Sequence, residues 1–230
     1  MSDNPGGTMQ VTTIRARNIF DSNSYLLQAE KGFILVDTGV ATRRSALVAA
    51  LKDAGCRPGA LRLIIITHVH TDHVGNAAFL RDKYGAPIAA HGAEMGAAEH
   101  GDMFWRPHAL PVAARLAKVA STLAGVVRFE PFVPDVVIGD GQNLAPYGLD
   151  ATLLHMPGHS PGSICVLTSE GLCFCGDLVR NSHGKVRRNR IVESRADYEA
   201  SLARLRTLPI TTVYPGHGEP FRSELLQTVF

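Results

Sequence analysis

The stretch Thr67-His68-Val69-His70-Thr71-Asp72-His73 is the densest cluster of metal-binding residue types in the chain. In an extended segment, His68, His70 and Asp72 would project to one side, and a turn into a following helix would bring His73 back toward them. Imidazole and carboxylate together suit divalent ions such as Zn²⁺, Mn²⁺ and Fe²⁺. A loop of solvated polar residues is the alternative, and four residues of ligand type so close together favour a metal site.

The elements on either side of this stretch indicate an α/β fold. Residues 61–66 form a continuous apolar run, which predicts a strand buried on both faces, and residues 74–84 predict a helix closed by Gly85. Strands and helices recur in the same order in both halves, so we expect a four-layer αββα sandwich of two mixed sheets packed face to face with helices outside. Further strands are expected at 11–17, 24–28, 32–36, 87–90, 133–138, 151–156, 163–168, 172–176 and 211–214, and further helices at 42–54 and 195–208.

We expect one domain over residues 1–230, because a chain of this length can bury most of its apolar surface in a single core. Residues 94–124 stand apart. They are rich in Ala, Glu, Met and Leu and are interrupted by Pro107 and Pro111, which predicts a helical insertion or lid.

Three later residues of ligand type follow short predicted strands, where loops commonly carry function. His159 and His217 each follow a Pro-Gly pair, and Asp177 follows Cys175-Gly176. Each alone is often only a turn residue. Added to the first four, they make seven ligands, which suits two metal ions that share one carboxylate.

The chain resembles the metallo-β-lactamase-fold hydrolases, in their glyoxalase II-like and lactonase-like branch rather than among true β-lactamases. The motifs that carry the resemblance are Val36-Asp37-Thr38-Gly39, the stretch from His68 to His73, His159, Asp177 and His217. They occur in the order and at the spacing ordinary for that family.

The resemblance implies two divalent metal ions, most simply zinc, with iron or manganese as alternatives. The first ion would be held by His68, His70 and His159, and the second by Asp72, His73 and His217. Asp177 would bridge the two ions. Asp37 would orient a ligand histidine, because the ring nitrogen opposite the metal needs an acceptor.

The expected reaction is hydrolysis, in which a hydroxide held between the two ions attacks the carbonyl of a small thioester, ester or lactone. Asp72 would also orient the hydroxide and pass its proton onward. Asp177 argues against β-lactam cleavage, and Arg180 stands where related lactonases carry a tyrosine. The alternatives are an iron-dependent oxidoreductase resembling persulfide dioxygenases and, less well supported, a phosphodiesterase or nuclease.

Composition limits the partners. The 23 basic and 21 acidic residues nearly balance, which argues against an electrostatically driven nucleic-acid binder. The apolar runs are too short to cross a membrane, and the polar N-terminus lacks the pattern of a secretory signal, so we expect a cytoplasmic protein. The sequence leaves the oligomeric state open.

The densest charge cluster lies at residues 180–190, which contain five cations and no acid. A solvated loop is one interpretation. The other is that Arg180 or Lys185 attracts an anionic small-molecule substrate to the metal site. The four cysteines are too few and too unevenly spaced for a disulfide framework, and we interpret them as core residues rather than zinc thiolates.

Overall fold

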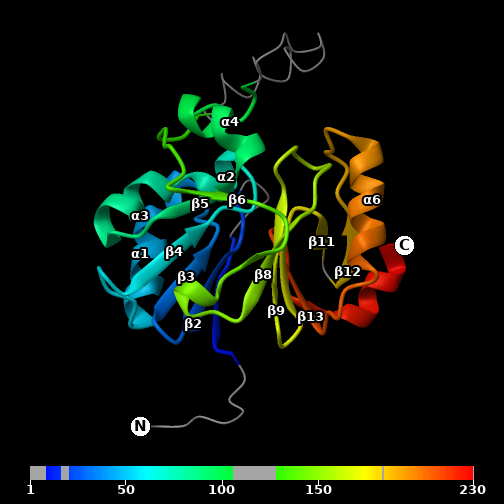
Figure 1. The fold of residues 1–230 in the computed structure, drawn as a ribbon, viewed down its shortest axis with the longest axis horizontal. Helices are drawn as coiled ribbons and strands as arrows, with labels where there is room; N and C mark the ends of the chain where they lie inside the picture. The colour runs from blue at the N-terminus through cyan, green and yellow to red at the C-terminus, as the bar shows by residue number, and fades with distance from the viewer. Residues whose placement is uncertain (1–8, 17–20, 106–127, 183, 230) are drawn as a thin grey trace.

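The structure is a computed structural model that describes residues 9–16, 21–105, 128–182 and 184–229. Two six-stranded sheets form its centre, with helices on both outer faces (Figure 1). Within these residues no helix has both the length and the apolar character needed to cross a membrane.

The first sheet begins as an antiparallel meander and continues with parallel strands. Its strands, in spatial order, are β1 (Val11–Ile14), β2 (Ser24–Ala29), β3 (Gly32–Val36), β4 (Leu61–Ile65), β5 (Ile88–His91) and β6 (Val136–Ile138). The second sheet is antiparallel except where β10 pairs with β13. Its strands, in spatial order, are β14 (Phe221–Arg222), β13 (Thr212–Pro215), β10 (Leu172–Gly176), β9 (Ile164–Thr168), β8 (Ala151–His155) and β7 (Gln142–Asn143).

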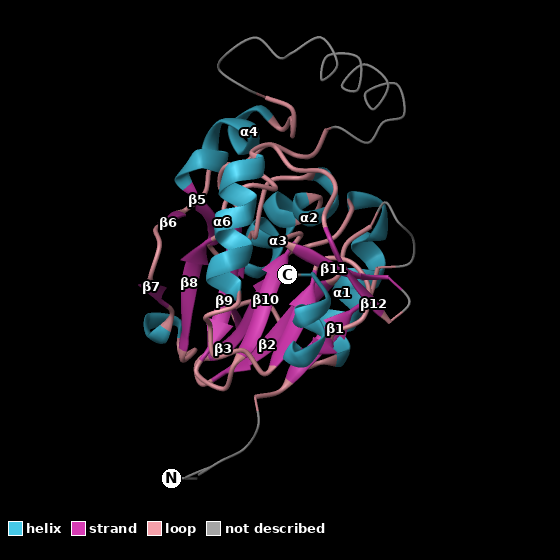
Figure 2. Ribbon diagram, turned by 90° about the vertical axis from the view of Figure 1, so that its right-hand side faces the viewer, coloured by secondary structure: helices cyan, strands magenta, loops and turns pink. Residues whose placement is uncertain are grey.

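The helices are short and lie mostly outside the sheets, as the two perpendicular views show (Figures 1 and 2). The α-helices are α1 (Arg44–Asp53), α2 (Thr71–Val74), α3 (Ala77–Tyr84), α4 (Met95–His100) and α6 (Arg195–Leu205). The 3-10 helices are η1 (Ala41–Arg43), η2 (Gly92–Glu94), η3 (Ala145–Tyr147) and η4 (Ser223–Val229). A separate hairpin is formed by β11 (Val179–Ser182) and β12 (Lys185–Arg188).

Three apolar clusters hold the layers together, as a four-layer sandwich requires. Alternation along β3 sends Leu35 outward with residues of α1 and α3, while Ile34 faces the second sheet. The central cluster joins Ile34 to Val166 and Phe174 of the second sheet. A third cluster packs the other face of that sheet against α6. The predicted αββα architecture is confirmed.

The helix predicted over residues 74–84 is wrong at its start. It consists of two pieces, α2 and α3, separated at Gly75-Asn76. Asn76 Nδ2 donates to the carbonyl of Thr38, at 2.7 Å, and to that of Val40. A Cβ at Gly75 would stand 2.4 Å from the backbone nitrogen of Ala41, so only glycine allows this approach. The first piece, α2, begins at Thr71, inside the ligand cluster.

One other expectation also needs correction. Residues 180–190 do not form a loop, because most of them build the β11–β12 hairpin. In the segment predicted as a helical insertion or lid, 94–124, the structure places α4, residues 106–124 lie outside the described residues, and the insertion stays a prediction.

Candidate metal centre

The seven predicted ligands come from four segments that follow the carboxyl ends of β4, β8, β10 and β13, and Asp72 and His73 lie in α2. The structure brings all seven together. The ligand atoms group into three overlapping sets, each with atoms within 4.8 Å of one another. These sets are His68, His70 and His159; His68, His73 and Asp177; and Asp72, His73 and His217.

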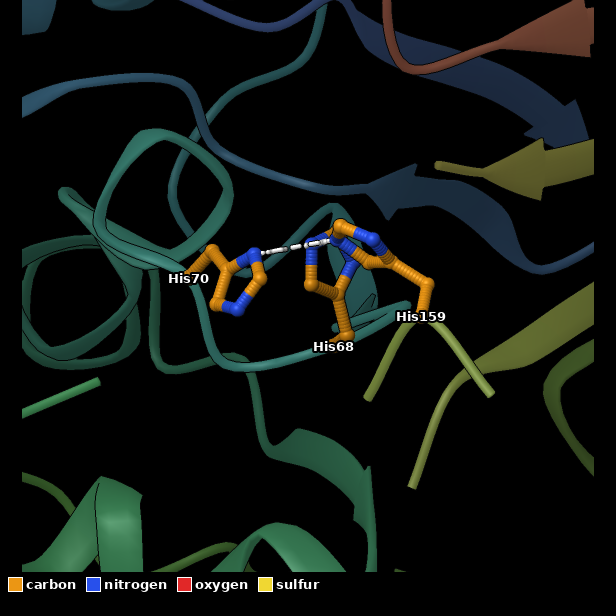
Figure 3. Close-up of side chains that lie close together, drawn as sticks. All are labelled: His68, His70 and His159. Atoms are coloured by element: carbon orange, nitrogen blue, oxygen red, sulfur yellow. Dashed lines mark hydrogen bonds between the residues drawn. The ribbon is translucent and has the colours of Figure 1, made fainter. Parts of the chain in front are cut away.

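The first set is a triangle of histidine nitrogens (Figure 3). His68 Nε2 lies 3.1 Å from His70 Nδ1, and His159 Nε2 lies 3.1 and 3.0 Å from these two atoms. Ligands about 2.0–2.1 Å from a tetrahedral zinc ion stand roughly 3.3 Å apart. The observed spacing is therefore close to what one shared ion requires.

The neighbours of this triangle orient its rings. His159 Nδ1 donates to the carbonyl of Ile191 at 2.6 Å, which turns the lone pair of Nε2 toward the cluster. His68 Nδ1 lies 3.1 Å from the Thr67 hydroxyl, which itself donates to Asp37 Oδ2 at 2.7 Å. The hydroxyl therefore accepts from His68, whose Nε2 is left as a metal-facing acceptor.

The second group combines two histidines with two carboxylates. His217 Nε2 lies 3.3 Å from Asp72 Oδ2 and 3.3 Å from Asp177 Oδ2, while His73 Nε2 lies 3.4 Å from Asp177 Oδ1. Asp177 Oδ2 is also 3.7 Å from His159 Nε2. Asp177 thus lies between the two groups, where a bridging ligand belongs.

Asp37 supports both groups from behind. Its Oδ2 accepts from His73 Nδ1 at 2.7 Å and its Oδ1 from the Thr67 backbone N–H at 2.8 Å. Asp37 is buried, and among the described residues it is the one non-glycine with a positive φ, +58°. Such strain concentrates at functional sites, and here it aims the carboxylate at the back of His73.

Burial and charge give the histidines different protonation states. Burial lowers the pKa of His68, and burial and His159 lower the pKa of His70 to about 3, so both rings are neutral at pH 7. Burial also acts to lower the pKa of His73 and His217, but the nearby carboxylates raise the first well above its usual value and the second to about 9. A cation in the second group would therefore displace protons.

Two buried atoms favour a cation directly. His73 Nε2 and Asp177 Oδ1 are buried and, within the described part of the chain, have no hydrogen-bond partner. Unpartnered polar groups of this kind are rare in folded proteins and need compensation. A metal ion between the two groups would supply it, so the residues present fit such an ion.

The structure corrects one step of the sequence argument. His68, His70 and Asp72 do not project to one side of an extended segment, because the chain enters α2 at Thr71. The helical turn moves Asp72 to the second group, beside His73 and His217. The placement of the seven residues matches the predicted grouping, and their role as metal ligands stays a prediction.

The predicted substrate contacts lie on the β11–β12 hairpin. Arg180 is half-buried and Lys185 is exposed. The register pairs Arg180 with Arg187 and Ser182 with Lys185, so the three cations share one face of the hairpin. Arg188 lies on the opposite face, where it pairs with Glu199 at 2.9 Å. A substrate role for Arg180 and Lys185 stays a prediction.

Sequence reasoning missed two buried side chains that support the ligand loops. Glu94 Oε1 accepts from the Ser160 hydroxyl at 2.6 Å and from the Gly162 N–H at 2.8 Å, and its Oε2 accepts from the Val69 N–H at 3.3 Å. Asn189 Nδ2 donates to Asp177 Oδ2 at 3.2 Å. Neither residue sits in a motif, so no local signal could have found them.

A glycine next to His217 is also required by the geometry. A Cβ at Gly216 would stand 2.4 Å from Asp177 Oδ1 and 2.8 Å from His73 Cε1. The Pro-Gly pair before His217 can be seen in the sequence, but the steric reason for the glycine can be seen only in the structure. The cysteines take no part: all four are free and buried, and three of them lie in the cluster beneath α6.

Comparisons with known proteins agree with this geometry. The family model described as "Metallo-beta-lactamase superfamily" matches residues 17–217. Acyl-coenzyme A thioesterase MBLAC2 from Bos taurus is 30% identical over 226 residues, covering 89% of this chain and 76% of the relative. Hydroxyacylglutathione hydrolase GloC from Haemophilus influenzae is 28% identical and covers 86% of each chain.

Two solved structures show the same fold. TTHA1623, solved in a di-iron-bound form, has a TM-score of 0.68 and 29% identity, covering 90% of this chain and 93% of its own. BLEG-1, a B3 metallo-β-lactamase, has a TM-score of 0.73 and 23% identity, covering 95% and 97%. At 23% identity, the likeness to BLEG-1 shows the fold alone.

Proposed function

The chain belongs to the metallo-β-lactamase superfamily, and from that membership and the ligand geometry we propose that it is a dinuclear metal-dependent hydrolase of thioesters. The observation that carries the proposal is the buried Asp177 carboxylate between two groups of histidines. At this junction Asp177 Oδ1 and His73 Nε2 have no hydrogen-bond partner among the described residues, as atoms that bind a cation would.

The proposed ligands form two groups that share one carboxylate. His68, His70 and His159 would hold one ion, Asp72, His73 and His217 the other, and Asp177 both. Two divalent ions bound by these residues would lower the pKa of a water molecule and would polarise a substrate carbonyl. Zinc is the simplest choice for this donor set, and iron is supported by the di-iron form of TTHA1623.

Residues of the chain itself orient the ligand histidines and accept protons. Asp37 holds His73 with Nε2 forward, and the Ile191 carbonyl does the same for His159. The Asp72 side chain is 23% exposed and Asp177 only 9%, so Asp72 is the carboxylate that faces the solvent edge of the site. We assign to Asp72 the transfer of the nucleophile's proton to solvent.

The substrate class follows from the relatives. MBLAC2 is named an acyl-coenzyme A thioesterase and GloC a hydroxyacylglutathione hydrolase. Both names describe thioesters of a small carrier, and esters and lactones share the reacting carbonyl. We therefore place thioesters first among the substrates to be tested.

The test combines metal analysis with a substrate panel of thioesters, lactones, aryl esters and phosphodiesters. Asp177→Asn should abolish thioester hydrolysis, because it removes the shared negative charge. Asp150→Asn, which changes an exposed carboxylate, is the matched control. Activity confined to phosphodiesters, or oxygen consumption with a glutathione persulfide in place of hydrolysis, would contradict the proposal. So would wild-type turnover by a folded Asp177→Asn protein.

A further inference from the structure

We propose that a pocket lined by five arginines beside the metal-ligand cluster binds phosphate groups of the substrate. The inference rests on the proposed function and narrows the substrate to thioesters of a phosphate-bearing carrier, of the chemical class of coenzyme A. The pocket has a volume of about 550 Å³, within the usual range for small-molecule sites. Its arginines are Arg180, Arg187, Arg188, Arg190 and Arg195.

Like charges face each other in this pocket. Arg180 and Arg187 are directly opposite in the register of β11 and β12, an arrangement that destabilises a strand pair. The Nε atom of Arg180 is buried and, in the part of the chain that the structure describes, has no hydrogen-bond partner. An anion between the two side chains would relieve the repulsion and satisfy this donor.

The charge balance points to phosphate rather than to carboxylate. In the described residues Arg188 and Arg195 share one acid, Glu199, at 2.9 and 3.1 Å. The described residues that line the pocket include five arginines and no acidic residue. A diphosphate with a phosphate monoester carries about four negative charges at neutral pH. A glutathione carrier, with two carboxylates and an ammonium group, carries a net charge of only about −1.

A short segment joins the pocket to the metal-ligand cluster. Asn189 lines the pocket and donates to the backbone oxygen of Asp177 at 3.0 Å as well as to its carboxylate. Two residues later, the Ile191 carbonyl accepts from His159. Arg190 stands between them and is exposed. The hairpin that carries the pocket lies beside α6 and the end of the chain (Figure 1). One short segment, residues 189–191, therefore contacts both the pocket and the ligand cluster, as binding of the two ends of one long substrate would require.

The experiment compares two thioesters of the same acyl group, one on coenzyme A and one on N-acetylcysteamine, which has no phosphate. The variants are Arg187→Gln and Arg190→Gln, because both side chains are exposed and neither forms an ion pair among the described residues. Arg57→Gln removes an exposed arginine far along the chain from the pocket and is the control. Titration calorimetry with pyrophosphate measures the pocket without any turnover.

Each pocket variant should lower the ratio of kcat/KM for the coenzyme A ester to that for the truncated ester by about tenfold or more, the usual loss for a charge-assisted hydrogen bond. Pyrophosphate affinity should fall to a similar extent, and the control should keep both wild-type values. An unchanged ratio, or a wild-type protein that does not bind pyrophosphate, overturns the pocket while leaving hydrolysis intact. A wild type that cleaves neither ester overturns the proposed function, and the pyrophosphate titration still decides the pocket.

Discussion

Replacing Asp37 with Asn should weaken the second metal site without removing any ligand. Three donors converge on this carboxylate: the Thr67 N–H, the Thr67 hydroxyl and His73 Nδ1, all at 2.7–2.8 Å. Asn tolerates the left-handed backbone that Asp37 adopts at φ +58°, so the loop itself is preserved. The substitution therefore isolates the hydrogen bonds.

The amide of the Asp37→Asn protein must set its NH₂ group against a donor at one of the two oxygen positions. The backbone N–H of Thr67 cannot change, whereas the ring proton of His73 can move from Nδ1 to Nε2, so the NH₂ group should face His73. Nε2 is the atom that faces Asp177, and a proton there blocks metal binding.

Loss of such a supporting contact typically weakens metal binding by about 10–100-fold. The charge-assisted bond itself contributes about 1.5–3 kcal/mol, so Tm should fall by about 3–12 °C.

The assay is competition with a chelator, which measures the affinity of each ion separately, together with thermal unfolding. Asp82→Asn is the matched control, because Asp82 is exposed and bonds only to the neighbouring Arg81 among the described residues. A folded Asp37→Asn protein that binds its second ion as tightly as the wild type would refute the proposal that Asp37 orients His73.

Three further substitutions and modifications test the surroundings of the site. Gly216→Ala should reduce kcat/KM by about a hundredfold or more, because the new methyl group overlaps a ligand carboxylate, whereas Gly139→Ala, in open space, should retain wild-type kinetics. Glu94→Gln should lower the free energy of unfolding by about 1–3 kcal/mol, because the new amide N–H would face a buried donor. Urea unfolding measures this change, and an unchanged urea midpoint would show that these hydrogen bonds are dispensable. The four cysteines should resist a thiol reagent at pH 8 in the native protein and react after unfolding, because they are buried and burial raises the pKa of Cys56 to about 11; rapid native labelling would contradict this.

The sequence is most informative where chemistry and local structure coincide. Each ligand residue follows a strand that can be predicted from its run of apolar residues. The ends of these strands bring the ligand segments to one edge of the sandwich. The alternation that sends Ile34 and Leu35 to different cores is likewise a local property of β3. Both features can be predicted without knowledge of the tertiary contacts.

What could not be predicted depends on contacts between distant segments. Glu94 reaches loops that start 25 and 66 residues away, at Val69 and Ser160. The break at Gly75 follows from the close approach of Ala41. The strands of the β11–β12 hairpin are polar and charged, so their sequence favours a loop, and only one face of the hairpin packs against the core. Propensity alone does not reveal such tertiary preferences.

The most direct test of the dinuclear hydrolase proposal is to remove all metal from the protein, restore it in known amounts and follow thioester hydrolysis. Two ions per chain should bind, and turnover should require the second ion, because Asp177 joins the two ligand groups. Full thioester hydrolysis by the metal-free protein, or saturation of both binding and activity at one ion per chain, would contradict the proposal.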